Sequence, residues 1–126
     1  MSNVLIVESQ EPYFQDLIAM VGECGVRITK AIDYGSALKT IVGSRVQILI
    51  LEWGHESEGA RELVAAIRKN HRTRRAHVIA VSENRTPEML ADALNATVED
   101  YFSWPVSISE IRSRLLWAAN RFEQLV

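Results

Sequence analysis

The stretch that most constrains this chain is residues 47–52, where four consecutive aliphatic side chains lead directly into the carboxylate of Glu52. A short run that is apolar on both faces is typical of a strand covered on both sides, as in a parallel sheet. Glu52 would then stand at the carboxyl end of that strand, where open α/β sheets place their ligand sites. The sequence therefore predicts a buried central strand with a candidate functional residue at its end.

Further segments have the composition of strands, and each is followed by apolar residues at helical spacing. Asp33 and Thr86 are typical helix-capping residues at the start of two of these helical patterns. Such strict alternation with short connections favours right-handed crossovers and a parallel sheet with helices on both faces. The expected strands, besides 47–52, are residues 3–7, 26–31, 76–81 and 97–102, and helical patterns begin near residues 12, 33, 60, 87 and 107.

Length and charge narrow the class of protein. We expect one domain over residues 1–126, because 126 residues suit a single hydrophobic core. The formal net charge of −2 predicts no nucleic-acid partner and no membrane partner. Cys24 is the single cysteine, which excludes an internal disulfide and fits a reducing cytoplasm. No secretory leader is expected from the first residues.

The residues that end the predicted strands follow a known pattern. Glu8, Glu52 and Ser82 end the first, third and fourth strands, and the fifth leads into Ser103-Trp104-Pro105. Over essentially its whole length the chain resembles the receiver (CheY-like) domain of response regulators in two-component signalling. The resemblance implies a flavodoxin-like (βα)5 three-layer sandwich whose five-stranded parallel sheet has the order 2-1-3-4-5.

The resemblance also implies a site, from which this sequence departs. A working receiver accepts a phosphoryl group on an Asp, where this chain has Glu52. It holds Mg²⁺ with a pair of acidic residues; Glu8 matches the first of them, but Ser9 replaces the second. It contacts the phosphoryl oxygens with a hydroxyl, which Ser82 matches, and with a Lys, which Trp104 replaces. Two further positions match: Tyr101 stands where the family has an aromatic switch residue, and Pro105 where a cis Pro is usual.

These departures argue against conventional phosphorylation, because transfer needs metal and cationic charge around an in-line carboxylate. Glu reaches about 1.5 Å farther than Asp, and a misplacement of about 1 Å can cost a hundredfold in rate. Trp104 carries no charge to pair with phosphate. We expect a degenerate phosphorylation site without a catalytic residue or cofactor and do not expect a Mg²⁺ site. Glu8, Glu52, Glu56 and Glu58 are the carboxylates that could ligate a cation, with Glu8 and Glu52 the weak candidates at the site itself and the other two expected in a solvated loop.

Several roles stay open at these positions. Glu52 either mimics a phosphorylated residue or is a carboxylate tolerated at a solvated strand end. Trp104 either packs over the former pocket, on Tyr101 or Pro105, or projects outward as a binding anchor. Trp53 follows Glu52 and is a second candidate to cover the same site.

Two other parts of the sequence are candidate binding surfaces. Leu116 and Trp117 form a second apolar set on the last helix, beside its core stripe, which indicates a contact surface. By resemblance, we expect a homodimer or partner contact through the face built by the fourth helix, fifth strand and last helix. The basic run from Arg68 to Arg75 invites a nucleic-acid interpretation, but without interleaved aromatics we expect a solvated, turn-like connection.

The resulting prediction is an atypical cytoplasmic receiver domain of phosphorelay signalling that is not an enzyme and acts through protein–protein interaction. Its expected partners are a signalling protein or histidine kinase. One alternative is a genuine phosphoacceptor with altered site chemistry. A weaker alternative is a small flavodoxin-like enzyme, although the sequence contains no nucleophile–base pair and no Gly-rich phosphate loop.

Overall fold

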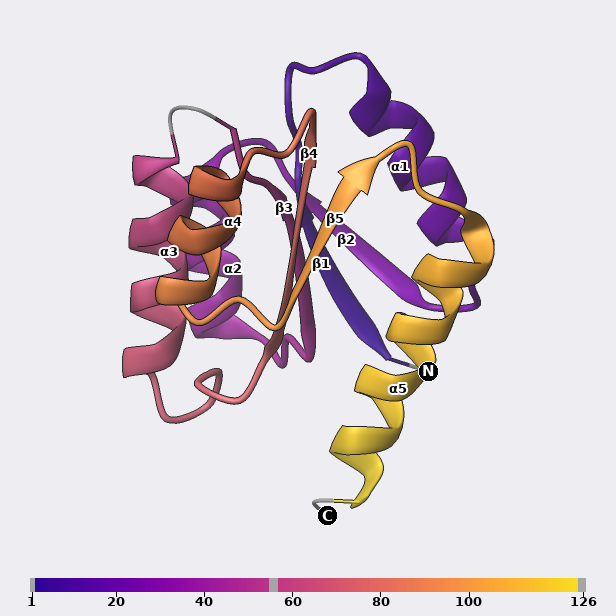
Figure 1. The fold of residues 1–126 in the computed structure, drawn as a ribbon. Helices are drawn as coiled ribbons and strands as arrows, with labels where there is room; N and C mark the ends of the chain where they lie inside the picture. The colour runs from indigo at the N-terminus through magenta and orange to yellow at the C-terminus, as the bar shows by residue number, and fades with distance from the viewer. Residues whose placement is uncertain (1, 55–56, 125–126) are drawn as a thin grey trace.

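The structure is a computed structural model that describes residues 2–54 and 57–124, with side chains described as far as Arg121. A parallel sheet lies between two layers of helices (Figure 1). Its strand order, β2-β1-β3-β4-β5, confirms the predicted architecture. In chain order the elements are β1 (Asn3–Val7), α1 (Tyr13–Gly22), β2 (Arg27–Ala31), α2 (Tyr34–Gly43), β3 (Ile48–Glu52), α3 (Glu58–Lys69), β4 (His77–Glu83), α4 (Pro87–Asn95), β5 (Asp100–Trp104) and α5 (Ile108–Gln124).

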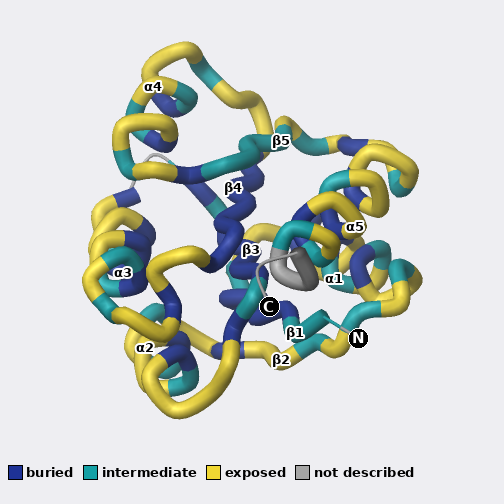
Figure 2. Tube along the Cα trace, turned by 90° about the horizontal axis from the view of Figure 1, so that it is seen from below, coloured by how far each residue is buried: buried dark blue, intermediate teal, exposed yellow. Residues whose placement is uncertain are grey.

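The central strands β1, β3 and β4 are buried along most of their length, whereas the edge strands β2 and β5 are more exposed (Figure 2). Alternate residues of each strand point to opposite faces of the sheet. Leu49 and Leu51 pack with α2, α3 and α4 on one face, and Ile48 and Ile50 pack with α1 and α5 on the other. The run at residues 47–52 is therefore apolar on both faces because both faces are covered.

The helix starts that the sequence predicts are present. Asp33 Oδ1 accepts a hydrogen bond of 2.7 Å from the backbone N–H of Ser36, and Thr86 Oγ1 accepts one of 3.1 Å from that of Met89. Each capping side chain satisfies a backbone donor that the first helical turn leaves free. Among the described helices, none combines the length and apolar character needed to cross a membrane.

Two boundaries differ from the sequence-based prediction. The fifth strand was expected over 97–102 but spans Asp100–Trp104, because Thr97 has a φ of 69°, which is incompatible with an extended strand. Arg68 was expected in a solvated connection but belongs to α3 and is only partly exposed. Its guanidinium hydrogen-bonds to Thr97 and Glu99, so the chain between α4 and β5 is shaped by a contact that periodicity does not reveal.

Candidate functional site

The carboxyl ends of the parallel strands meet at one edge of the sheet and gather the residues that the sequence singled out. Glu8 and Ser9 follow β1, Glu52 ends β3, Ser82 lies near the end of β4, and Trp104 ends β5. The β3–β4 and β4–β5 ladders run in parallel register up to these ends. The residues to which the resemblance assigns the phosphorylation site therefore lie at the same edge of the sheet.

Both carboxylate oxygens of Glu52 accept hydrogen bonds from hydroxyl groups of the protein. Ser9 Oγ donates to Oε1 over 2.8 Å, and Tyr13 Oη donates to Oε2 over 2.8 Å. Ser9 Oγ in turn accepts a hydrogen bond from the backbone N–H of Glu11. Glu52 is thus a hydrogen-bonded part of the fold, tied to the loop after β1 and to the first turn of α1.

Tyr13 is the member of this site that sequence reasoning missed. Its side chain is buried, and burial raises the pKa of its phenol far above the ordinary value, with the hydrogen bond to Glu52 and the charge of that residue raising it further. Tyr13 therefore stays protonated and remains a donor. A signal existed in the sequence, since a helix that begins at Pro12, just after β1, places its first turn at this edge of the sheet.

Trp104 packs over the site, but on a different residue from those expected. Its ring stacks on Tyr13, with ring centroids 5.5 Å apart and planes 28° apart. The predicted partners were Tyr101 or Pro105. Tyr101 lies three positions earlier in the strand and so faces the opposite side of the sheet. The Trp104–Pro105 peptide bond is cis.

Ser82 and Tyr101 form a separate pair on the face covered by α2, α3 and α4. Tyr101 Oη donates to the backbone carbonyl of Trp53 over 3.1 Å, and Ser82 Oγ lies 2.7 Å from the same phenol oxygen. Because a phenol has one hydrogen, Ser82 must donate to Tyr101. The hydroxyl at the phosphoryl-contacting position is consequently directed at Tyr101.

Trp53 does not cover the site, as one interpretation of the sequence proposed. Its side chain is fully buried in the cluster that packs on α3 and α4, and its indole Nε1 donates to Asp92 over 3.3 Å. Ser57 Oγ donates to the same carboxylate oxygen over 2.8 Å. These two bonds attach the chain after β3 to α4, so Trp53 serves the packing of that layer.

A hollow of about 280 Å³ lies beside Glu52 between the loops after β1 and β2. Four of the described residues that line it are acidic and none is Lys or Arg. A phosphoryl dianion would meet like charges there, which disfavours its binding. The acidic lining residues are Glu8, Glu11, Asp33 and Glu52.

Arg85, in the loop between β4 and α4, is a candidate cation from the same edge of the sheet. Its Nη1 donates to the backbone carbonyl of Tyr101 over 3.0 Å, and its guanidinium lies 5.6 Å from the centroid of the Tyr101 ring. Arg85 is thus held on β5, so it does not replace the Lys that the family places where this chain has Trp104.

The residues present do not fit a Mg²⁺ ion. A hard cation needs several anionic or carbonyl oxygens that are free to coordinate. Ser9 supplies a neutral hydroxyl where the resemblance implies a second carboxylate, and each oxygen of Glu52 already accepts a hydrogen bond, from Ser9 and from Tyr13. Among the residues that the structure describes, no group of three His, Cys, Asp or Glu side chains is arranged to hold a metal.

The predicted interface residues lie away from this edge, on α5. Leu116 and Trp117 have 56% and 49% of their surface exposed. Trp117 packs against the buried ring of His77 in an edge-to-face arrangement, with centroids 5.5 Å apart. The second apolar set of the last helix is therefore on the surface.

Comparison with known proteins finds receiver domains among solved structures. The chain superposes on the receiver domain of the sensor histidine kinase PA1611 from Pseudomonas aeruginosa, whose active-site cleft coordinates magnesium, with 22% identity, a TM-score of 0.81, and coverage of 94% of this chain and 98% of that one. A response regulator receiver domain protein from Clostridium thermocellum is 15% identical, with a TM-score of 0.83 and coverage of 100% of both chains. The chemotaxis protein CheY4 from Vibrio cholerae is 17% identical, with a TM-score of 0.79 and coverage of 94% of this chain and 98% of that one.

No protein-family model and no curated protein sequence matches the chain. At these identities the structural likeness establishes the fold, and the chain has the receiver-domain fold over essentially its whole length.

Proposed function

We propose that this chain is a signalling domain that acts by binding other proteins and is not phosphorylated on Glu52 in the conventional way. The observation that carries the proposal is the pair of hydrogen bonds from Ser9 and Tyr13, which engage both oxygens of the Glu52 carboxylate. A nucleophilic carboxylate has to turn an oxygen in line with the phosphoryl group, and the two hydrogen bonds hold Glu52 toward Ser9 and Tyr13 and lower the charge available on each oxygen.

The surroundings of Glu52 support the same proposal. Phosphoryl transfer depends on positive charge that offsets the charge developing on the transferred oxygens. The adjacent hollow is acidic, Trp104 brings an aromatic ring where the family has a Lys, and Ser82 is engaged with Tyr101. Each of the three features removes a contact on which a working receiver depends.

Glu52 itself acts as a structural carboxylate in this proposal. A mimic of the phosphorylated state would engage the hydroxyl of Ser82, but the hydrogen bonds of Glu52 go to Ser9 and Tyr13 on the other side of the site. We therefore favour the interpretation in which the carboxylate fixes the loop after β1 against β3. The conformation of the domain would then be set by the fold and by its partners.

The partners that we propose are proteins of a two-component pathway in the cytoplasm, such as a histidine kinase or another signalling protein. The solved structures that the chain resembles are domains of a sensor kinase and of response regulators. A homodimer through the α4-β5-α5 face stays a prediction. Light scattering that gives only monomers, unchanged by Trp117→Ala, would count against it.

The proposal is tested with beryllium fluoride, which imitates an attached phosphoryl group on a receiver Asp. Amide resonances near Ser82 and Tyr101 are followed by NMR while Mg²⁺ and beryllium fluoride are added. We expect no change beyond that produced by fluoride and Mg²⁺ alone. The matched control is the variant Ser9→Asp/Glu52→Asp/Trp104→Lys, which restores the family's charges and should respond more strongly. A saturable response of the unaltered chain would overturn the proposal in favour of a genuine phosphoacceptor.

A further inference from the structure

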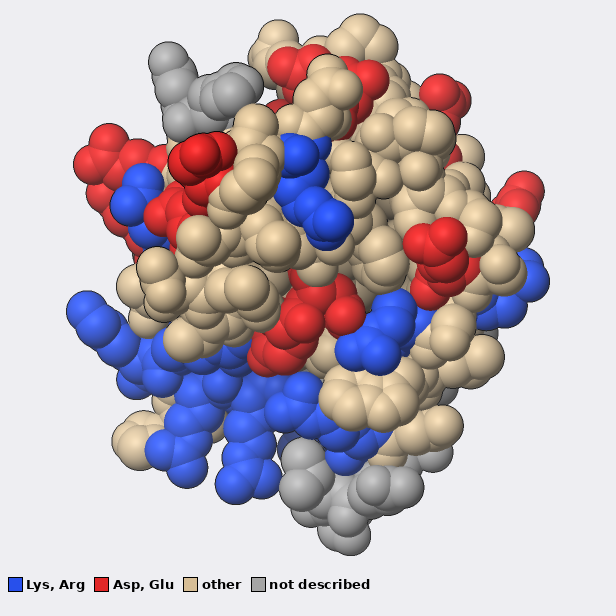
Figure 3. Space-filling model, in the orientation of Figure 1, with Lys and Arg blue, Asp and Glu red and all other residues tan. Residues whose placement is uncertain are grey.

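Charge is distributed unevenly over the molecule, although its net value is only −2. Lys and Arg side chains gather on the lower part of the view in Figure 3, below most of the Asp and Glu side chains. This region is the amino edge of the sheet, where the turn between α3 and β4 carries exposed cationic side chains. These are Lys69, Arg72, Arg74 and Arg75, and we call this set the basic turn.

Two acidic groups at the start of β5 are already paired with other residues. Glu99 forms a bidentate pair with Arg68, with both N···O distances below 3 Å. Asp100 is held by His77 and by Arg114, whose Nε lies 2.9 Å from Oδ1. Among the described residues, no member of the basic turn takes part in an ion pair. Its positive charge is therefore available to a partner.

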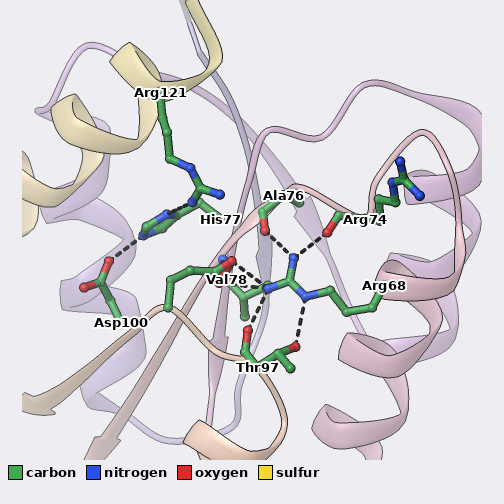
Figure 4. A network of polar contacts seen from close by, with 9 residues as sticks. Arg68, Arg74, Ala76, His77, Val78, Thr97, Asp100 and Arg121 are labelled. Atoms are coloured by element: carbon green, nitrogen blue, oxygen red, sulfur yellow. Dashed lines mark hydrogen bonds and ion pairs between the residues drawn. The ribbon is translucent and has the colours of Figure 1, made fainter. Parts of the chain in front are cut away.

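Hydrogen bonds hold the backbone of the basic turn against α3. Thr73 is buried, and its Oγ1 donates to the carbonyl of Ile67, while the backbone N–H groups of Thr73 and Arg74 donate to the carbonyl of Asn70. Arg68 Nη1 donates to the carbonyls of Arg74 and Ala76 over 2.8 and 2.7 Å. Figure 4 shows the Arg74 guanidinium turned away from this network. Because the backbone is fixed, ordering these side chains on a partner costs less entropy than in a mobile loop.

The structure supplies the aromatic side chain that the basic run lacks in sequence. Trp117 of α5 packs on His77, two residues beyond Arg75, and Arg121 Nη1 lies 3.4 Å from His77 Nδ1 (Figure 4). The guanidinium carbons of Arg114 and Arg121 lie 4.7 and 5.6 Å from the centroid of the Trp117 ring. Trp117 and these two arginines therefore lie against the start of β4, which directly follows the basic turn.

Trp117 supplies the apolar contact of this surface. About half of its surface is exposed, and the guanidinium groups of Arg114 and Arg121 lie close to its ring. A half-exposed Trp among Arg side chains matches the anatomy of protein interfaces, in which an apolar centre is enclosed by a polar rim.

We propose that this surface, made by the basic turn and Trp117, binds an acidic segment of a partner protein that also carries an apolar side chain. The inference deepens the proposed function, on which it rests, by assigning the chemistry of the partner. Carboxylates of the segment would pair with the guanidinium groups of the basic turn, since Arg presents a planar fork that suits carboxylates. Its apolar side chain would pack on the exposed part of Trp117.

Nucleic acid fits the same surface less well. Binding of single strands relies on bases that stack on exposed aromatic faces. The guanidinium groups of Arg114 and Arg121 lie 4.7 and 5.6 Å from the centroid of the Trp117 ring, which leaves less of the ring for a base to stack on. A nucleic-acid partner is therefore an outcome that the experiment must be able to detect.

The experiment uses a fluorescent Glu-rich peptide with interspersed Leu residues as the probe, and a peptide with Gln in place of Glu as its control. We expect the acidic peptide to bind, with affinity falling at least about tenfold between about 50 and 300 mM salt. NMR shifts should map to the basic turn and to residues 114–121. Trp117→Ala, and Arg72→Gln/Arg75→Gln, should each weaken binding about tenfold or more. The matched variant Lys30→Gln/Lys39→Gln, at exposed positions elsewhere, should change it less than about twofold.

Several results would overturn the inference. One is that the acidic peptide does not bind. Another is that the two double Gln variants weaken binding equally, and a third is that the NMR shifts map outside the basic turn and residues 114–121. Tighter binding of an oligothymidine would assign the surface to nucleic acid, and self-association that Arg72→Gln/Arg75→Gln abolishes would assign it to a second copy of this chain. The beryllium fluoride titration is run on the same samples. If the acidic peptide does not bind and the Glu52 site does not respond to beryllium fluoride, this inference is overturned while the proposed function stands.

Discussion

The phenol of Tyr13 donates a 2.8 Å hydrogen bond to Glu52 Oε2 across 39 positions of the chain. This bond joins the first turn of α1 to the carboxyl end of β3. Together with the bond from Ser9, it converts the position of a phosphoacceptor into an internal contact of the fold. The stacking of Trp104 on Tyr13 covers the same contact from β5. The site is therefore built around a carboxylate that is held in place by hydroxyl groups.

Tyr13→Phe is the most direct test of this contact. The substitution keeps the ring that stacks on Trp104 but removes the donor to a charged, partly buried carboxylate. We expect the free energy of unfolding to fall by about 1–2 kcal/mol, as measured by urea denaturation. Tyr34→Phe is the control, because the Tyr34 hydroxyl makes no hydrogen bond within the part of the chain that the structure describes. It should lower the free energy of unfolding by less than about 0.5 kcal/mol. Equal losses in the two variants would contradict the structural role of Tyr13.

Arg68 should be a principal stabilising residue at the opposite edge of the sheet. Its guanidinium donates to the carbonyls of Arg74, Ala76 and Thr97 and forms a bidentate pair with Glu99. We expect Arg68→Ala to lower the free energy of unfolding by about 2–4 kcal/mol, since it leaves several polar groups without partners. Arg68→Lys should recover less than half of that loss, because an ammonium cannot reproduce the fork. Lys69→Ala, at the exposed neighbouring position, is the control, and a similar loss there would refute the assignment.

Asp100 should make the free energy of unfolding depend on pH. Burial alone would raise the pKa of Asp100, but its contacts with His77 and Arg114 outweigh burial and hold the pKa below the ordinary value. A carboxyl group whose pKa is lower in the folded state stabilises the fold above its unfolded pKa, which is about 4, and loses that contribution as the pH falls through the folded value. The difference in unfolding free energy between the native chain and Asp100→Asn should therefore be largest near neutral pH and shrink below about pH 4. Urea titrations across this range measure it, and a difference that grows on acidification would contradict the prediction.

The fold was predictable from sequence because its signals are local or periodic. The aliphatic run before Glu52, the caps at Asp33 and Thr86, and the alternation of strand and helix together define the order of elements. Strand ends then place Glu8, Glu52 and Ser82 at one edge by geometry alone. The start of the fifth strand was wrong because the positive φ of Thr97 and its contact with Arg68 are tertiary features.

The contacts within the site were less predictable than its position. The position of the first helix start places Tyr13 near this edge, but the sequence does not show that its hydroxyl meets the Glu52 carboxylate. The partner of Trp104 was misassigned because neighbours in sequence were favoured, although strand alternation sends Tyr101 to the other face. In the sequence, Trp117 and the basic run are far apart and were interpreted separately. The packing of Trp117 on His77, two residues after Arg75, shows that the indole lies near the basic turn.

The central claim is that Glu52 is not a conventional phosphoacceptor, and intact-mass spectrometry after incubation with acetyl phosphate and Mg²⁺ tests it most directly. The account predicts an unchanged mass for the native chain. A gain of one phosphoryl group that is present in the native chain and absent in Glu52→Gln would contradict it.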